Sequence, residues 1–452
     1  MNDARPISAS TSGIKKRFLS GAIVSTIGRA SKLGFSLLIN VILARLLSPA
    51  ELGNYYLLIS IATFGSLVAV VGMNKIAMKR AAESVVQGDV FEVGVAISST
   101  FIYVVVGSVA TLVAYWLSSH KLADLFDSPI LFSSCGVILL LITSLSLERY
   151  FADVFRGIRK INYAIMYDGA LFSVVAFIYF VFAYWLYGAL SIGEAILATA
   201  SMHLIIGLAA LLYFVVSGKI SLSKYRTDLT AWVVGWKQML AEIALYMLSE
   251  AAIIILGIYE SKENVALYSL ALRLIMIVRF SQFVVNAVVP PLISELNVSG
   301  EKKSLEKLLR AVATLVFYIG LVISAVFFVF GKEIISILFG PEYVHASVVL
   351  MILLVGQLAN LYVGSCGQLL MMTGNQQALM IISVFVLLFT VVFSALFVGD
   401  YGIKGVACVF SGMTIIQSVL TAVSARYFVG IWTFSMLPTR DTIKTGCRLI
   451  IK

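Results

Sequence analysis

Long apolar runs recur along almost the whole chain, and they constrain its fold more than any other feature. A helix that crosses the roughly 30 Å hydrocarbon core of a bilayer needs about 20 mostly apolar residues. Twelve runs reach this length, approximately 18–46, 55–73, 94–117, 130–147, 165–187, 193–216, 236–258, 264–293, 309–331, 346–372, 379–399 and 403–429. The sequence therefore predicts an all-α polytopic membrane protein with twelve transmembrane helices.

The composition agrees with a chain dissolved in lipid. Apolar residues make up 60% of it and charged residues only 12%, about half of what a water-facing surface requires. Soluble enzyme classes are excluded on this ground. Lys15, Lys16 and Arg17 precede the first run, but that run is far longer than the apolar part of a secretory signal, so we expect a retained membrane anchor.

The basic residues divide unevenly between the two sides of this topology. The N-terminus, the even-numbered connections and the C-terminus hold 24 of the 33 Lys and Arg, whereas the other side has Arg45, Lys121, Lys262, Lys332 and Lys404. By the positive-inside rule both termini are predicted to be cytoplasmic. This asymmetry accounts for most of the net charge of +10, so no nucleic-acid partner is expected. The connections on the other side are short, and no exported catalytic domain is predicted.

Three local resemblances indicate an internal repeat. Residues 51–56 resemble residues 263–268, Tyr187-Gly188 matches Tyr401-Gly402, and Gly157 matches Gly374, at offsets of 212, 214 and 217. Two pseudo-symmetric six-helix lobes of the same orientation would flank a central cavity. The predicted divisions are a cytoplasmic N-terminal segment, an N-lobe, a cytoplasmic interlobe loop, a C-lobe and a cytoplasmic tail, at 1–17, 18–216, 217–235, 236–429 and 430–452.

Four cations lie inside predicted spans and are the first candidates for substrate binding. Arg29 and Lys32 fall in the first span, and Arg273 and Arg279 in the eighth. Their insertion would cost roughly 10 to 14 kcal/mol in total if they faced lipid, so they are expected to face water, protein or a ligand. The first span also places polar residues on the face of Arg29 and Lys32, among them Ser36 and Asn40.

Two glutamates in the seventh span allow two interpretations. Glu242 and Glu250 are candidates for proton coupling, and they are equally candidates for structural interlobe ion pairs with Arg273 and Arg279.

Milder polar stripes and a proline pair complete the set of intramembrane features. The stripes are Gln282 and Asn286 with Arg279; Gln357, Asn360, Gly364 and Gln368; and Ser411, Thr414, Ser418 and Thr421. Small polar residues of this kind are more often packing than function. Pro290 and Pro291 should break or kink the eighth helix, as a hinge or as a helix stop.

Motifs of energy-coupled and hydrolytic enzymes are absent. The sequence has no P-loop, no H-E-x-x-H and no G-x-S-x-G, and its four cysteines lack C-x-x-C spacing. We therefore expect no cofactor, no metal site and no ATPase activity, and transport would be driven by an ion gradient, the membrane potential or the substrate gradient.

Residues 44–55, ARLLSPAELGNY, resemble the "A-R-x-L-x-P-x-x-x-G-x-Y" stretch of Wzx-type polysaccharide flippases in the multidrug/oligosaccharidyl-lipid/polysaccharide exporter superfamily. Residues 266–273 resemble the family's "G-x-Y-x-x-A-x-R", with Ala266 in the place of its first Gly, and 339–343 and 400–407 resemble later loop signatures. The resemblance extends from about residue 14 to 430.

This resemblance implies a protein that is not an enzyme. It would be a multi-pass protein of the bacterial cytoplasmic (inner) membrane that flips undecaprenyl-pyrophosphate-linked oligosaccharide repeat units, for O-antigen or exopolysaccharide synthesis. Arg29 and Arg273 stand where the family has intramembrane arginines that would meet the pyrophosphate. Membrane lipids, a polysaccharide polymerase and a chain-length regulator are the implied partners. Two alternatives stay open, a drug/cation antiporter of the same superfamily and an intramembrane polysaccharide polymerase or ligase.

Overall fold

The computed structural model describes the backbone of residues 11–220, 226 and 229–436, with side chains from residue 28 onward except those of residues 29, 229, 287 and 288. The described residues fold into helices without any strand. In chain order these are α1 (Thr11–Leu46), α2 (Pro49–Val70), α3 (Met73–Gln87), α4 (Val90–Leu125), α5 (Ile130–Ser133), α6 (Cys135–Gly157), α7 (Ile161–Ile165), the π-helical η1 (Met166–Ala170), α8 (Leu171–Tyr187), α9 (Ile192–Val216), α10 (Leu229–Tyr259), α11 (Lys262–Val298), α12 (Lys302–Leu338), the 3-10 turn η3 (Pro341–Tyr343), α13 (Ala346–Val363), α14 (Cys366–Met372) and α15 (Gln376–Val429).

The helices are long enough to cross a membrane many times. Among the residues whose side chains are described, ten helical segments have the length and apolar composition of a span. One of them, the 54-residue α15, is interrupted at Gly402 (φ 56°, ψ −145°) and supplies two crossings, and the 36-residue α1 adds another. The all-helical polytopic fold predicted from the sequence is confirmed, and the protein is a multi-pass integral membrane protein.

The same terminating devices recur at equivalent places in the two halves. The Ser48 hydroxyl accepts from the Glu51 N–H at 3.4 Å at the start of α2, and the Ser261 hydroxyl accepts from the Asn264 N–H at 3.4 Å at the start of α11. Such caps satisfy helix N–H groups that have no intrahelical partner. Gly188, which ends α8, and Gly402, which interrupts α15, both have positive φ, of 70° and 56°, but their ψ angles of −28° and −145° differ. The two serine caps agree with the predicted internal repeat.

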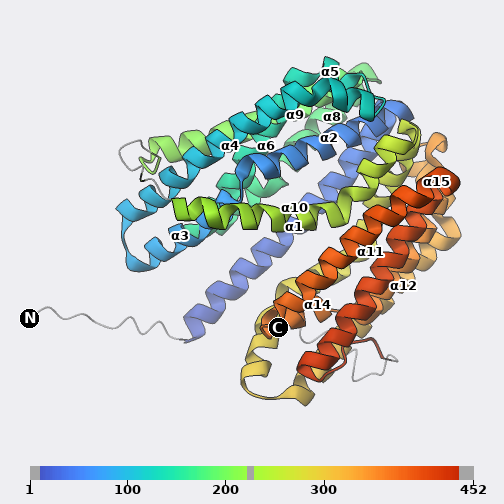
Figure 1. The fold of residues 1–452 in the computed structure, drawn as a ribbon. Helices are drawn as coiled ribbons and strands as arrows, with labels where there is room; N and C mark the ends of the chain where they lie inside the picture. The colour runs from blue at the N-terminus through green and yellow to red at the C-terminus, as the bar shows by residue number, and fades with distance from the viewer. Residues whose placement is uncertain (1–10, 221–225, 227–228, 437–452) are drawn as a thin grey trace, which may run out of the picture.

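The helices form two groups that meet at one end of the molecule (Figure 1). We call α1–α9 the first lobe and α10–α15 the second lobe. Helices α11–α15 diverge from the first lobe toward the end that holds α3 and α14, whereas α10 stays packed beside α3. At the meeting end Gly53 of α2 lies so close to α11 that a Cβ there would be 1.7 Å from the Lys262 carbonyl oxygen. The Tyr343 hydroxyl also donates to the Leu47 carbonyl at 3.4 Å. The two lobes are therefore closed against each other at this end.

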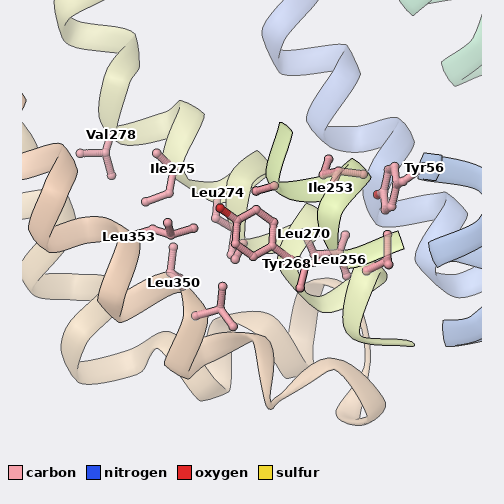
Figure 2. Packing of buried hydrophobic residues seen from close by; sticks show 14 of the residues in the cluster. Tyr56, Ile253, Leu256, Tyr268, Leu270, Leu274, Ile275, Val278, Leu350 and Leu353 are labelled. Carbon is pink, nitrogen blue, oxygen red and sulfur yellow. The ribbon is translucent and has the colours of Figure 1, made fainter. Parts of the chain in front are cut away.

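A buried cluster joins the second lobe to α2, as Figure 2 shows. Tyr268 of α11 is fully buried in it and Tyr56 of α2 is 3% exposed. Around them pack Ile253, Leu256, Leu270, Leu274, Ile275, Val278, Leu350 and Leu353. In contrast, large apolar side chains such as Trp185, Val329 and Ile381 lie exposed on the outer faces of α8, α12 and α15. An exposed apolar surface of this extent is suited to contact with lipid chains.

The chain after α15 returns across the second lobe as an extended strap, residues 430–436. The Ser435 N–H donates to the Tyr362 carbonyl at 2.8 Å, and the Thr433 hydroxyl donates to the Val363 carbonyl at 2.8 Å. These carbonyls end α13, where Gly364 with φ 77° separates it from α14. The strap thus supplies hydrogen bonds to backbone groups that the helix break leaves open.

The orientation predicted from the basic residues can be tested on α12 alone. Lys302 and Lys332 are both exposed and lie near opposite ends of this helix. In an otherwise cysteine-free variant, we expect a membrane-impermeant maleimide on intact cells to label a cysteine at 332 and to spare one at 302. Permeabilised cells should label both, which controls for reactivity. The reverse pattern on intact cells would place the closed end in the cytoplasm.

Candidate functional site

A polar cavity of about 400 Å³ lies among the helices of the second lobe. Its lining comes from α10, α11, α13, α14 and α15, and the charged residues in that lining are Glu250, Arg273 and Arg279. Six carboxamides join them: Gln282, Asn286, Gln357, Asn360, Gln368 and Gln417. A cavity inside membrane-spanning helices with an excess of positive charge and many hydrogen-bonding groups is suited to a polar, anionic ligand.

Arg273 lies where the two lobes meet. Its guanidinium carbon is 5.6 Å from the centroid of the Tyr56 ring on α2, within cation–π range. In the described part of the chain its Nε, although buried, has no hydrogen-bond partner. A buried donor without a partner is costly, and an anionic oxygen entering the cavity would satisfy it.

Arg279 lies six residues further along α11 and lines the same cavity. Its side chain is exposed. Helical spacing alone places Arg273 and Arg279 about 120° apart. The cavity nevertheless receives both, because α10 and α13 through α15 surround α11 on this side.

The carboxamides of α11 and α13 are held in part by one another. Asn360 Nδ2 donates to Gln282 Oε1 at 3.3 Å, and the Ser365 hydroxyl donates to Asn286 Oδ1 at 2.8 Å. Gln357 Nε2 is buried and has no partner among the described residues. Each amide presents a donor and an acceptor, so this wall can bind hydroxyl groups. Of the residues that line this cavity, the sequence indicated every carboxamide except Gln417, and it did not indicate Ser365.

A second, mostly apolar cavity of about 300 Å³ lies between α1 and α11. Its lining includes Leu33, Ser36, Met276 and Phe280, and Arg273 borders it as well. Among the described residues, the two cavities share two lining residues, Arg273 and Met276, and Arg273 is the charged one of the two.

The other candidates on α1 are placed differently from one another. The side chain of Arg29 lies outside the described residues. Lys32 faces η1, where its ammonium donates to the Asp168 carbonyl and lies 3.9 Å from the Asp168 carboxylate. Asn40 is buried and accepts from the Tyr56 hydroxyl at 2.6 Å. The stripe predicted on this face is therefore divided among η1, the apolar cavity and α2.

The two glutamates of α10 have separate surroundings. Glu242 lies 3.2 Å from the Lys75 ammonium of α3 and accepts from Asn74 at 3.1 Å. Lys75 also pairs with Asp153 of α6 at 2.8 Å. Glu250 lines the polar cavity instead. Within the described residues neither glutamate forms an ion pair with Arg273 or Arg279, so Glu242 joins the lobes through Lys75 rather than through an arginine.

Pro290 and Pro291 do not end α11. The helix continues through both to Val298, so the expectation of a helix stop is wrong. Each proline removes one backbone hydrogen bond, and the turns on either side retain theirs, as membrane helices commonly allow. A hinge at these residues stays a prediction.

The sequence also matches a known family model over most of its length. The family described as "Polysaccharide biosynthesis protein" matches residues 42–348, more than half of the 452-residue chain. The chain belongs to this family. No curated protein sequence matches it significantly.

Solved structures show that this member of the polysaccharide biosynthesis family has the transporter fold of the MOP superfamily. An inward-facing multidrug resistance MATE family transporter of that superfamily has a TM-score of 0.72 at 15% identity, covering 90% of this chain and 98% of its own. The lipid II flippase MurJ in an inward closed conformation has a TM-score of 0.68 at 14% identity, covering 95% and 91%. A MOP superfamily transporter from Pyrococcus furiosus, whose binding pocket is described as having reverse polarity, has a TM-score of 0.60 at 17% identity, covering 92% and 96%.

Proposed function

We propose that this protein flips undecaprenyl-pyrophosphate-linked oligosaccharide repeat units from the cytoplasmic to the outer leaflet of the bacterial inner membrane, for O-antigen or exopolysaccharide synthesis. Membership of a polysaccharide biosynthesis family and the MOP transporter fold support it. So does the activity of one structural neighbour, which is a lipid II flippase. A polysaccharide polymerase and a chain-length regulator would act on the product at the outer leaflet.

The observation that supports it most is the position of Arg273 between two unlike cavities. On one side lies the cavity with carboxamides, and on the other the apolar cavity against α1. The chemical groups of a lipid-linked sugar follow one another in the same order: hydroxyl-rich sugars, then an anionic pyrophosphate, then a hydrocarbon chain. Arg273 would bind the phosphates bidentately, while Gln357 and Asn360 bind sugar hydroxyls and the apolar cavity receives the first prenyl units.

Alternating access would move the head group between the two sides. The lobes are closed at the end where Gly53 meets Lys262, and α11–α15 diverge from the first lobe at the end that holds α3 and α14 (Figure 1). In the predicted orientation this arrangement admits a substrate from the cytoplasmic side. Closing that end and separating Gly53 from Lys262 would expose Arg273 to the opposite side.

The alternatives fit the cavity less well. Two arginines against one glutamate would repel an organic cation, which disfavours a drug/cation antiporter. An intramembrane polymerase or ligase needs paired acid and base groups at the bond that reacts. The described lining of the polar cavity holds one carboxylate and no histidine, so it favours binding and transport over catalysis.

The leaflet in which lipid-linked repeat units accumulate tests this proposal directly. In cells that lack the protein, we expect the units to accumulate in the inner leaflet, out of reach of a lectin or glycosidase added to spheroplasts. Accumulation in the outer leaflet would indicate a polymerase or ligase. Loss of organic-cation efflux without any accumulation would indicate a drug exporter.

A further inference from the structure

A histidine and a glutamate contact each other inside the first lobe, away from both cavities. His203 of α9 lies with its Nδ1 2.9 Å from Oε1 of Glu148 on α6. Their side chains are only 10% and 6% exposed. Gly207, one turn after His203, lets α9 approach α6, because a Cβ there would already be 3.1 Å from Leu147 Cβ.

This pair lies near the middle of the span formed by α9. His203 is eleven residues from the start of α9 and thirteen from its end, which places it about 16 Å along the helix. That is close to the middle of a roughly 30 Å hydrocarbon core. Ionisable groups at such a depth are costly and are retained mainly where they function.

The pair is neutral only while it holds one exchangeable proton. Imidazolium beside carboxylate is neutral overall, and so is imidazole beside carboxylic acid. Release of the proton leaves a buried carboxylate next to an uncharged ring, which low-dielectric surroundings disfavour. Imidazole is the side chain whose charge ordinarily changes between about pH 5 and 8.

The neighbours of the pair connect it to α1. The His203 ring stacks on Phe172 with centroids 3.7 Å apart and an interplanar angle of 13°. Phe172 lies in the first turn of α8, directly after η1, whose Gly169 has φ 93°. The charged groups that act on Glu148 from packed elements are Lys32 of α1 and Asp168 of η1.

Two other polar groups lie close by. The Tyr167 hydroxyl of η1 is within electrostatic range of Glu148. Arg149 follows Glu148 on α6, and its Nε has no hydrogen-bond partner in the described part of the chain. Arg156, two turns further along α6, pairs with Asp168 at 2.6 Å. Lys32 and Asp168 are half exposed, so the side of the pair that faces α1 and η1 borders solvent.

We propose that Glu148 and His203 form a proton-binding site that sets how firmly α1 is held to the first lobe. With the proton released, Glu148 adds its negative charge to that of Asp168 and attracts Lys32, so α1 stays docked on η1. Binding of the proton removes this charge and loosens α1, which lies between the lobes. The helix is kinked at Asp168 and Gly169 of η1, so the docking partner of α1 lies at a break in the helix.

Spin-label distances on the full-length protein in lipid nanodiscs test the site without any lipid-linked substrate. Val86 on α3 and Val298 on α11 are 71% and 88% exposed at the diverging end, and cysteines there can carry the labels in an otherwise cysteine-free protein. Lowering the pH from about 8 to 5 should change the distribution of distances between the two labels, because α1 packs against both η1 and α11. His203→Gln and Glu148→Gln should each flatten this pH dependence, since an amide cannot exchange the proton.

The matched control is a second histidine–carboxylate pair at the surface. His120 and Asp124 of α4 lie 3.1 Å apart and are 73% and 71% exposed, so His120→Gln removes an imidazole without touching the buried pair. His120→Gln should retain the full pH response. A native protein without pH dependence, or a His203→Gln protein that keeps it, overturns the proposal. If His203→Gln fails to fold, Glu148→Gln decides, because its carbonyl oxygen still accepts from the imidazole.

This proposal rests on the alternating access of the proposed function. It adds that the proton is the ion that controls the movement of α1. The distance measurement contains no lipid-linked sugar, so its failure leaves flipping intact as a proposal. Conversely, a protein that does not flip lipid-linked sugars can still show this pH response.

Discussion

Replacement of Arg273 by alanine is expected to lower flipping by roughly ten- to hundredfold while the protein stays in the membrane at its native level. The loss corresponds to about 1.5 to 3 kcal/mol for a hydrogen bond to a charged group. Arg273→Lys should recover part of the rate, because the ammonium keeps the charge but lacks the planar fork. Proteoliposomes with a fluorescent undecaprenyl-pyrophosphate oligosaccharide measure both rates.

Arg426 offers a matched control for Arg273. Its guanidinium carbon lies 5.7 Å from the Trp432 ring, almost the distance that Arg273 has to Tyr56, but it lies at the end of α15 outside the lining of both cavities. Arg426→Ala removes an equivalent cation–π contact and the Arg426 hydrogen bond to the Gly430 carbonyl, but it removes no cavity cation. Because the strap keeps its hydrogen bonds to Tyr362 and Val363, this variant should flip near the native rate. Equal rates for Arg273→Ala and Arg426→Ala would show that the cavity does not bind pyrophosphate through Arg273.

Gly53→Ala is expected to open the end of the molecule where the lobes meet. A Cβ at this position would lie 1.7 Å from the Lys262 carbonyl oxygen, so α2 and α11 must separate. Overpacking of this kind costs about 1 to 3 kcal/mol, which lowers the closed-to-open ratio roughly 5- to 150-fold. A cysteine in place of Ala266, which is fully buried one turn into α11, should then react faster with an impermeant maleimide, and flipping should fall.

Gly136→Ala is the corresponding control. Gly136 begins α6 close to the same end, and a Cβ there would meet nothing within 4 Å. This variant should label and flip like the native protein. Unchanged labelling of the cysteine at 266 in Gly53→Ala would mean that the closed end does not depend on this contact.

The number of transmembrane helices could be predicted from the lengths of the apolar runs, but the residues at which the helices end could not. The run 130–147 was expected to end where Glu148 and Arg149 interrupt it, but α6 continues to Gly157. The length of an apolar run cannot show whether the charged residue that ends it lies outside the membrane or, like Glu148, is buried against a partner such as His203. Equally, Pro290 removes a hydrogen bond without ending α11, because the loss concerns one bond in a helix of 37 residues.

The polar cavity could be anticipated in part, since its residues repeat on single helix faces. Gln357 and Asn360 lie three residues apart on α13 and share a face. Contacts between distant segments could not be predicted in this way. Lys32 and Asp168 are 136 residues apart. The kink at Asp168 and Gly169 could have been predicted from the Asp-Gly pair, but the contact with α1 could not.

The strap formed by residues 430–436 affects how topology reporters on this protein should be read. It bonds to Tyr362 and Val363, and Val363 and Gly364 line the polar cavity. A reporter enzyme fused directly after Val429 would therefore remove part of the support of the binding site along with the tail. Loss of polymer export in such a fusion would then reflect a damaged cavity wall, and a fusion after Met436 is the one whose reporter signal can be compared with the intact transporter.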